Sequence, residues 1–169
     1  MNRAEQQRKR LKHFALKNLG KLYKYAVKKS EIGKFFDCSS LTQYLYRRIG
    51  IEIPRSTILQ ASCGRMVPAR KHGLIFKPKD LKVGDLLFFK GEKGHYNKEF
   101  PQGIGHVEMY LGNGKLIEAC GHSRENNRKV KLINLKKELK RRDFCLVKRI
   151  LKGSDVKRWH NDYIQFFKK

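Results

Sequence analysis

Residues 36–46 of the chain are Phe-Asp-Cys-Ser-Ser-Leu-Thr-Gln-Tyr-Leu-Tyr, a run in which a cysteine directly precedes an apolar pattern. The apolar residues recur at helical spacing and Gly50 supplies a natural stop, which together predict a helix that runs to about Arg48. Asp37 and the two serines after Cys38 are good N-terminal capping residues. We therefore expect Cys38 at or just inside the start of this helix.

A thiol at that place lies at the positive end of the helix dipole, beside backbone N–H groups without helical partners. Both stabilise the thiolate, which is the form that attacks carbonyl carbons. The alternative is a buried structural cysteine, because free cysteines are among the most buried residues. Cys38 is a candidate nucleophile if a base lies nearby in the fold.

The composition is strongly basic, and the charge is uneven along the chain. The 169 residues include 40 Lys and Arg against 15 Asp and Glu, a net charge of +25. Residues 1–34 hold 11 basic and 2 acidic side chains, and residues 121–169 hold 16 and 5. Such a field favours polyanionic partners such as nucleic acid, an anionic membrane surface or an acidic polymer. A lysine-rich composition that serves only solubility is the alternative.

The cysteines and the apolar runs of the sequence indicate in which cellular compartment the protein is expected. The four cysteines form no C-x-x-C pair, and if Cys38 is a nucleophile an odd number remains, so we expect reduced thiols rather than a disulfide framework. The longest wholly apolar run, residues 86–89, is too short for a membrane span. We find no secretory signal pattern, which predicts a cytoplasmic protein or one exported by an unconventional route; the localisation is otherwise unknown.

The rest of the chain predicts an α+β fold, with N-terminal helices packed on an antiparallel sheet. The expected helices are a basic one at 3–19, with Leu11, Phe14, Ala15 and Leu19 on one face, a short one from Ser56 or Thr57 to Gly64, and one at 154–167. The expected strands are 85–90, 104–111, 115–120, 130–135 and 144–150; Asn113-Gly114 predicts a hairpin between the second and third. We expect a loop at 65–82 and a solvated turn or helix at 136–142.

His106 is the best candidate for the base. Strand alternation puts Ile104, His106, Glu108 and Tyr110 on one face. An even pairing register across the hairpin brings Glu118 opposite His106 or one diagonal away, whereas a one-residue slip turns Glu118 to the other face. In the first case Cys38 attacks, His106 transfers the proton and Glu118 orients the imidazole. A surface glutamate and a structural histidine are the alternatives.

A zinc site is a weaker interpretation. Cys120 and His122 could join Cys63 and His72 as ligands, but zinc sites usually present two closely spaced ligand pairs and the chain offers one. We therefore predict no metal and no other cofactor.

Four segments in order resemble the NlpC-type cell-wall cysteine peptidases: residues 37–40 (Asp-Cys-Ser-Ser), 53–56 (Ile-Pro-Arg-Ser), 81–89 and 105–119. The similarity extends over roughly residues 20–150. It implies a papain-like domain, which we place at 20–152, flanked by a basic N-terminal helix (1–19) and a basic C-terminal helix (153–169). It also implies hydrolysis of peptidoglycan stem peptides, typically after a γ-linked D-glutamate.

The resemblance further implies roles for individual residues. The family's third catalytic position, usually a histidine, is Glu118 here, and the tyrosine thought to assist the oxyanion corresponds to Tyr23, with Tyr25 as a competing match. The positions near the stem peptide correspond to Asp37, Ser39 and Arg55, and an arginine suits a substrate carboxylate. The chain departs from the family at Glu108, where a small residue is usual.

Three functions remain open from the sequence. The first is a thiol peptidase that acts on peptidoglycan peptides by a Cys38–His106–Glu118 triad and is held on acidic polymer by its basic flanks. The second is a catalytically idle scaffold that binds polyanions, for which affinity would fall steeply with salt. The third is an amidase or acyltransferase on another substrate, because one triad serves several reactions. The oligomeric state cannot be predicted.

Overall fold

The structure, a computed structural model, describes residues 1–67, 78–91, 94–121 and 128–151. Its elements in chain order are α1 (Arg3–Leu16), β1 (Leu22–Tyr23), η1 (Lys29–Glu31), β2 (Phe35–Phe36), α2 (Cys38–Arg47), α3 (Thr57–Ser62), β3 (Arg65–Met66), η2 (Pro78–Asp80), β4 (Leu86–Phe89), β5 (His106–Gly112), β6 (Lys115–Ala119), β7 (Val130–Asn134), α4 (Leu135–Glu138) and β8 (Phe144–Arg149).

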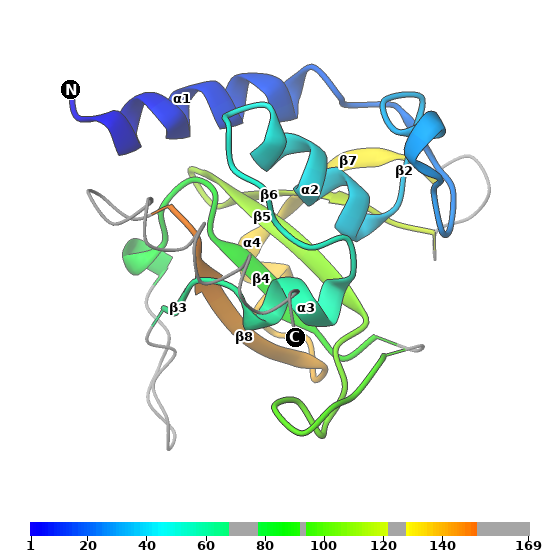
Figure 1. Cartoon of the computed structure of the whole chain (residues 1–169). Coiled ribbons are helices and arrows are strands. Elements are labelled where there is room, and N and C mark those ends of the chain that lie inside the picture. The colour runs from blue at the N-terminus through cyan, green and yellow to red at the C-terminus, as the bar shows by residue number, and fades with distance from the viewer. Residues whose placement is uncertain (68–77, 92–93, 122–127, 152–169) are drawn as a thin grey trace, which may run out of the picture.

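The main sheet has six strands in the order β3-β8-β4-β5-β6-β7, and every neighbouring pair is antiparallel. β1 and β2 form a separate two-residue parallel pair beside it. The helices α1 and α2 lie on one side of the sheet, with α2 against β5 and β6 and α1 on α2 (Figure 1). This arrangement confirms the predicted α+β class with N-terminal helices on an antiparallel sheet.

Strand alternation separates two apolar clusters, one on each face of the sheet. The larger one joins α1 and α2 to the sheet through Leu11, Leu41, Leu45, Val107 and Met109, among others. The smaller one lies under α4 and includes Leu87, Phe89, Tyr110, Leu116 and Leu135. The sheet is therefore covered on both faces, and the N-terminus of α2 is fixed relative to β5 by the larger cluster.

The hairpin between β5 and β6 is confirmed. Gly112, Asn113 and Gly114 all have positive φ, at 91°, 51° and 68°, which glycine and asparagine adopt more readily than other residues. Met109 pairs with Ile117 and Tyr110 with Leu116. This is an even register, so Glu118 lies on the same face as His106, one diagonal away.

The predicted N-terminal helix is wrong at its C-terminal end. It ends at Leu16, and Leu19 lies beyond it with 39% of its surface exposed instead of packing with Leu11. The Asn18 side chain donates to the Phe14 carbonyl oxygen at 2.7 Å, and Gly20 takes the left-handed conformation at φ 82°. The apolar period continues to Leu19, but these local groups terminate the helix first.

The region expected to be a loop at 65–82 contains two short elements. Arg65 and Met66 form β3, which pairs with β8, and Pro78–Asp80 form η2. A two-residue strand carries too little pattern to be recognised from sequence, because its pairing depends on the neighbouring strand. Residues 68–77 and the helix predicted at 154–167 lie outside the described residues.

The charge run at 136–142 is less solvated than predicted. Its first part belongs to the short helix α4, in which Glu138 is buried, and Arg141 reaches carboxylates of three other residues. In the described part of the chain, no helix has both the length and the apolar composition that a membrane span requires.

Candidate active site

Cys38 is the first residue of α2, as predicted. Asp37 is its N-cap: one carboxylate oxygen accepts from the Ser40 backbone N–H at 2.8 Å, and the Ser40 hydroxyl accepts from the Asp37 N–H at 2.9 Å. This reciprocal capping box fixes the helix start. The Cys38 thiol therefore lies where the helix dipole and N–H groups without helical partners favour a negative charge.

Buried polar contacts hold this helix start against α3. The Gln60 side-chain amide donates to the backbone carbonyls of Ser39 at 2.9 Å and Pro54 at 2.7 Å, while its oxygen accepts from the Thr42 hydroxyl at 2.7 Å. Gln60 and Thr42 are almost fully buried. Because every one of these bonds spans two segments, the position of Cys38 depends on the packing of α3 as well as α2.

The thiol has two polar neighbours. Thr57 Oγ1 lies 3.8 Å from Cys38 Sγ, a contact that the sequence did not indicate because Thr57 was expected only to cap α3. The second neighbour is the His106 imidazole. Burial alone would raise the pKa of Cys38, but the hydrogen bond and positive charge of His106 outweigh it, so the pKa of the thiol is lowered.

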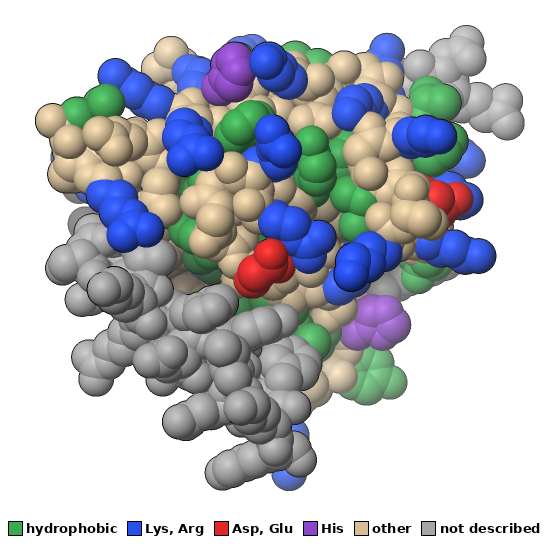
Figure 2. Space-filling view, turned by 45° about the horizontal axis from the view of Figure 1, so that its top comes forward, with side chains coloured by type: hydrophobic (Ala, Val, Ile, Leu, Met, Phe, Trp, Pro, Cys, Tyr) green, Lys and Arg blue, Asp and Glu red, His purple; other side chains and the backbone are tan. Residues whose placement is uncertain are grey.

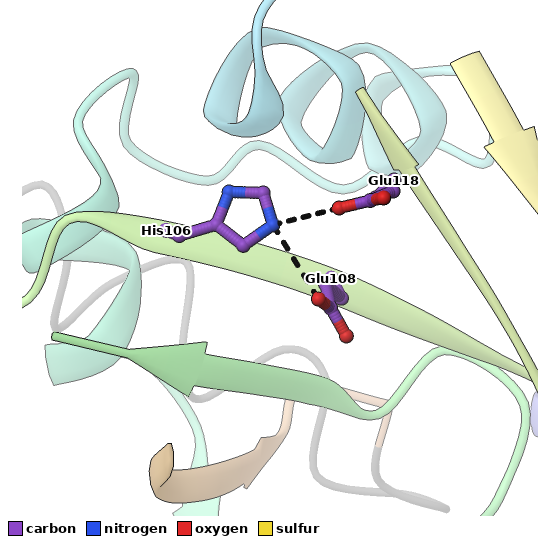
Figure 3. A group of neighbouring side chains, drawn as sticks. All are labelled: His106, Glu108 and Glu118. Atoms are coloured by element: carbon purple, nitrogen blue, oxygen red, sulfur yellow. Dashed lines mark hydrogen bonds and ion pairs between the residues drawn. The ribbon is translucent and has the colours of Figure 1, made fainter. Parts of the chain in front are cut away.

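His106 is the first residue of β5, and its ring packs near that of Phe89 with 6.0 Å between centroids. Its Nε2 lies 3.0 Å from Glu118 Oε2 and 3.4 Å from Glu108 Oε1 (Figure 3). Burial would lower the pKa of His106, but hydrogen bonds to Cys38, Glu108 and Glu118 raise it well above the ordinary value. These contacts favour the protonated form of the ring, which lies between the Cys38 thiol and the two carboxyl groups.

Glu118 comes from β6 and is nearly buried. The register of the hairpin brings it to His106, which confirms the predicted pairing, and Lys131 Nζ lies 3.6 Å from its other oxygen. Burial would raise the pKa of Glu118, but the hydrogen bond with His106 and the charges of His106 and Lys131 lower it. Glu118 is thus an anion over the whole neutral range.

Tyr23 is partly buried and close enough to Cys38 for the thiolate charge to affect its pKa, whereas Tyr25 is exposed. The Tyr23 ring packs on Gly121, where a Cβ atom would lie 2.4 Å from Tyr23 Cε1. Burial and the nearby Cys38 and Asp37 charges raise the pKa of Tyr23 to about 12, so its hydroxyl keeps its proton as a donor. Tyr25 has 67% of its surface exposed. Of the two tyrosines that the sequence leaves open, Tyr23 is the one whose pKa Cys38 affects, and its role in the reaction stays a prediction.

The three residues predicted to bind substrate form one cluster. Arg55 donates from Nη2 to the Asp37 carboxylate, from Nη1 to Ser39 Oγ at 2.8 Å and from Nη2 to the Val27 carbonyl at 3.2 Å. Asp37 also accepts from the Val27 N–H at 3.2 Å. Much of the Arg55 charge is therefore balanced within the protein, a pairing that the sequence did not predict.

Among the described residues, one group has spacing that could suit a metal ion: His106, Glu108 and Glu118, whose ligand atoms lie within 4.8 Å of one another. The arrangement does not fit a cation well, because His106 Nε2 faces the carboxylates as a donor and the cations Arg141 and Lys131 already contact them. Of the four residues considered for zinc, Cys63 and Cys120 carry free thiols, and His72 and His122 lie outside the described residues.

Glu108 is the residue whose position at the site the sequence did not predict. The sequence marks Glu108 as an unusual residue on the His106 face but indicates no partner for it. In the structure its neighbours are His106 and Arg141, and Arg141 follows α4 in the chain. All four cysteines are free in the structure.

Comparison with known proteins gives a consistent result. The sequence model of the NlpC/P60 family matches residues 20–149. The chain is 32% identical over 114 residues to a gamma-D-glutamyl-L-lysine dipeptidyl-peptidase of Bacillus subtilis. The matched stretch covers 68% of this chain and 32% of that protein. It is 38% identical over 86 residues to the peptidoglycan endopeptidase RipB of Mycobacterium tuberculosis, covering 51% of this chain and 28% of RipB.

Solved structures show the same fold. The crystal structure of RipB superposes with a TM-score of 0.62 at 28% identity and covers 88% of this chain and 67% of that one. The crystal structure of an NlpC/P60 family protein from Bacillus cereus superposes with a TM-score of 0.64 at 27% identity. The superposition covers 86% of this chain and 40% of that one. The chain spans about a third of the length of the curated relatives named above.

Proposed function

The chain belongs to the NlpC/P60 family, and from this premise we propose that it is a cysteine peptidase that hydrolyses peptidoglycan stem peptides after a γ-linked D-glutamate. The observation that carries the proposal is the line from Cys38 through His106 to Glu118, with a lowered thiol pKa and a raised imidazole pKa. Burial raises the pKa of a structural cysteine in an apolar setting. Cys63 is an example, because burial raises its pKa to about 11.

The proposed reaction has two halves. The Cys38 thiolate attacks the amide carbonyl, and the negative charge passes to the carbonyl oxygen. In this proposal the backbone N–H groups at the start of α2 and the Tyr23 hydroxyl donate hydrogen bonds to that oxygen. The His106 imidazolium then gives its proton to the departing amine as the C–N bond breaks, which leaves a thioester on Cys38.

The second half regenerates the enzyme. Neutral His106 takes a proton from a water molecule as that water attacks the thioester carbonyl, and the C–S bond breaks to release the acid and the thiolate. Glu118 holds the ring with Nε2–H toward itself and Nδ1 toward the sulfur side, and it stabilises the imidazolium that forms in each cycle.

Substrate contacts are proposed for the Arg55 cluster. A guanidinium has five N–H donors, and the three hydrogen bonds of Arg55 to Asp37, Ser39 and Val27 leave two for a substrate group. The Arg55 side chain has 37% of its surface exposed and the Asp37 side chain 8%. We propose that Arg55 offers its remaining donors to a stem-peptide carboxylate or carbonyl, while Asp37 holds it in place.

The test is digestion of muropeptides. Purified protein is incubated with tripeptide and tetrapeptide muropeptides, and products are identified by mass spectrometry. We expect cleavage after γ-D-glutamate by the unaltered protein and by Cys63→Ser, and no cleavage by Cys38→Ser. An intact substrate under all conditions, or equal cleavage by Cys38→Ser, would reject the proposal.

A polyanion partner is a second proposal, and the charge distribution favours it. Figure 2 shows the face that carries α1, over which Lys and Arg side chains are widespread and acidic ones few. We propose that this surface holds the protein on an acidic polymer near its substrate. Retention on a polyanionic resin should fall steeply with salt and persist in Cys38→Ser. Retention that is insensitive to salt would reject an electrostatic role.

A further inference from the structure

Glu108 lies near the middle of β5 and its side chain is fully buried. Charged side chains are almost never fully buried without a partner, because removing a carboxylate from water is costly. Its neighbours along the strand, Val107 and Met109, are apolar core residues. A glutamate here costs stability, so the contacts of its two oxygens indicate what it does.

The two oxygens of Glu108 have different surroundings. Oε1 lies 3.4 Å from His106 Nε2 and 3.4 Å from Arg141 Nη1, both of which are donors. Oε2 is buried and has no hydrogen-bond partner in the described part of the chain. When Glu108 is neutral, its proton therefore belongs on Oε2, which leaves Oε1 as an acceptor for both neighbours.

We propose that Glu108 is a positioning residue of the active site, which shares the Nε2 side of the His106 ring with Glu118 and adds a second negative charge there when it ionises. Figure 3 shows the two carboxyl groups converging on one ring nitrogen from β5 and β6. Glu118 makes the shorter contact, at 3.0 Å, and remains the principal partner. Glu108 limits the rotation of the ring and sets how strongly His106 holds its proton.

Arg141 makes the second carboxyl group tolerable. It contacts Glu108 from Nη1 and also binds Glu138 at 2.9 Å and Asp143 at 2.8 Å, so its charge is divided among three acids. Its guanidinium also lies over the Phe89 ring, 4.2 Å from the centroid. Arg141 is thus fixed in place, but it only partly neutralises Glu108.

Burial sets the direction of the Glu108 titration, and the charged groups around it oppose or add to that effect. The charged groups are His106 on the same strand, Glu118 on β6, Lys131 on β7 beside Glu118, Glu138 on α4, and Arg141 with Asp143 before β8. On the neighbouring strand β4, the residue opposite Glu108 is the apolar Leu87. Burial is the main reason that the pKa of Glu108 is raised, to about 7. The hydrogen bond and charge of His106 lower it, and the nearby Glu138 and Glu118 charges raise it further. Glu108 is thus mostly neutral below pH 7 and mostly an anion above it.

The consequence for His106 follows from this sign. Below about pH 7 Cys38 and Glu118 supply the negative charge that stabilises the imidazolium. Above it the Glu108 anion adds to that stabilisation and delays loss of the ring proton. A cysteine peptidase loses activity at high pH when its imidazolium deprotonates. Glu108 therefore extends the active range toward alkaline pH and leaves the acid limb, set by Cys38, in place.

The inference rests on the proposed function for its catalytic consequence, but its main test needs no substrate. Protein with ¹⁵N-labelled histidine is titrated by NMR, with the His106 signals assigned by comparison with His106→Gln. In Glu108→Gln, which keeps an acceptor oxygen but cannot ionise, the pKa of His106 should fall by about one unit. Glu138→Gln is the matched control: it removes a buried carboxylate from Arg141 without touching the ring, and should leave the His106 pKa nearly unchanged.

A second measurement uses the unaltered protein, so the test survives if Glu108→Gln fails to fold. The His106 Nε2 shift should show an additional inflection near pH 7 as Glu108 titrates. An unchanged His106 pKa in folded Glu108→Gln, an equal fall in Glu138→Gln, or a single inflection in the unaltered protein would overturn the inference. Failure to cleave muropeptides would instead reject the peptidase proposal and leave this titration to be judged separately.

Discussion

Glu118 Oε2 lies 3.0 Å from His106 Nε2, across the hairpin that joins β5 and β6. The two residues are one diagonal apart in an even register, so the contact depends on the turn at Gly112–Gly114 as well as on the residue types. It places an anion beside the imidazole that also hydrogen-bonds Cys38.

Replacement of Glu118 by glutamine tests the charge of this contact. The amide oxygen can still accept from Nε2–H, but the negative charge is gone, so the pKa of His106 should fall and the alkaline limb of activity should move to lower pH. We expect kcat/KM to fall roughly tenfold at pH 8 and less at pH 6, as measured by muropeptide cleavage. An unchanged pH profile would contradict an electrostatic role for Glu118.

Tyr23 should contribute to the transition state rather than to substrate binding. Tyr23→Phe removes a proton donor beside the thiol, and we expect kcat to fall by about 10²-fold with little change in KM. Tyr25→Phe is the matched control, because Tyr25 is exposed and lies two residues away, and its kinetics should equal those of the unaltered protein. Equal effects of the two substitutions would argue against an oxyanion role for Tyr23.

Asp37 should matter more for stability than an exposed acid that also pairs with an arginine. Asp37→Ala removes the N-cap of α2 and the partner of Arg55, so we expect a loss of about 2–3 kcal/mol in the free energy of unfolding. Glu52→Ala breaks a pair with Arg47 in which both side chains are more than 40% exposed, and should cost about 0.5 kcal/mol or less. Urea denaturation measures both, and similar losses would contradict the capping argument.

Asp85 and Arg149 form a buried pair with bonds of 2.8 and 2.7 Å, and their side chains are 0% and 8% exposed. Asp85→Leu alone should cost about 3–5 kcal/mol, because it leaves a buried guanidinium unpaired. The double variant Asp85→Leu with Arg149→Met should recover part of that loss in the same denaturation experiment. A double variant less stable than the single one would contradict this account of the pair.

The sequence predicts the parts of this site that depend on local chemistry. The capping residues place Cys38 at the start of α2, and the turn residues together with strand alternation bring Glu118 to the face of His106. Each of these predictions depends on the geometry of one helix or one hairpin, which periodicity and turn residues determine. The class of fold follows from the order of these elements.

The sequence does not reveal contacts between distant segments. Arg141 lies in a charge run that resembles any solvated turn, and its contact with Glu108 depends on how α4 packs under the sheet. Thr57 reaches the thiol because α3 packs against α2. Arg55 matched a binding position, but its pairing with Asp37 spans 18 residues and carries no periodic pattern. Such contacts are set by tertiary packing.

The central claim is that Cys38 is a thiolate held by His106, and competitive alkylation at pH 6 tests it most directly. Limiting iodoacetamide is added to the folded protein, and modification of each cysteine is followed by mass spectrometry. Cys38 should react at least about tenfold faster than Cys63, Cys120 or Cys145, because its pKa is lowered while burial raises the pKa of Cys63 and Cys145. His106→Ala should remove this advantage. Equal rates at all four thiols in the unaltered protein, or a fast Cys38 in His106→Ala, would contradict the account.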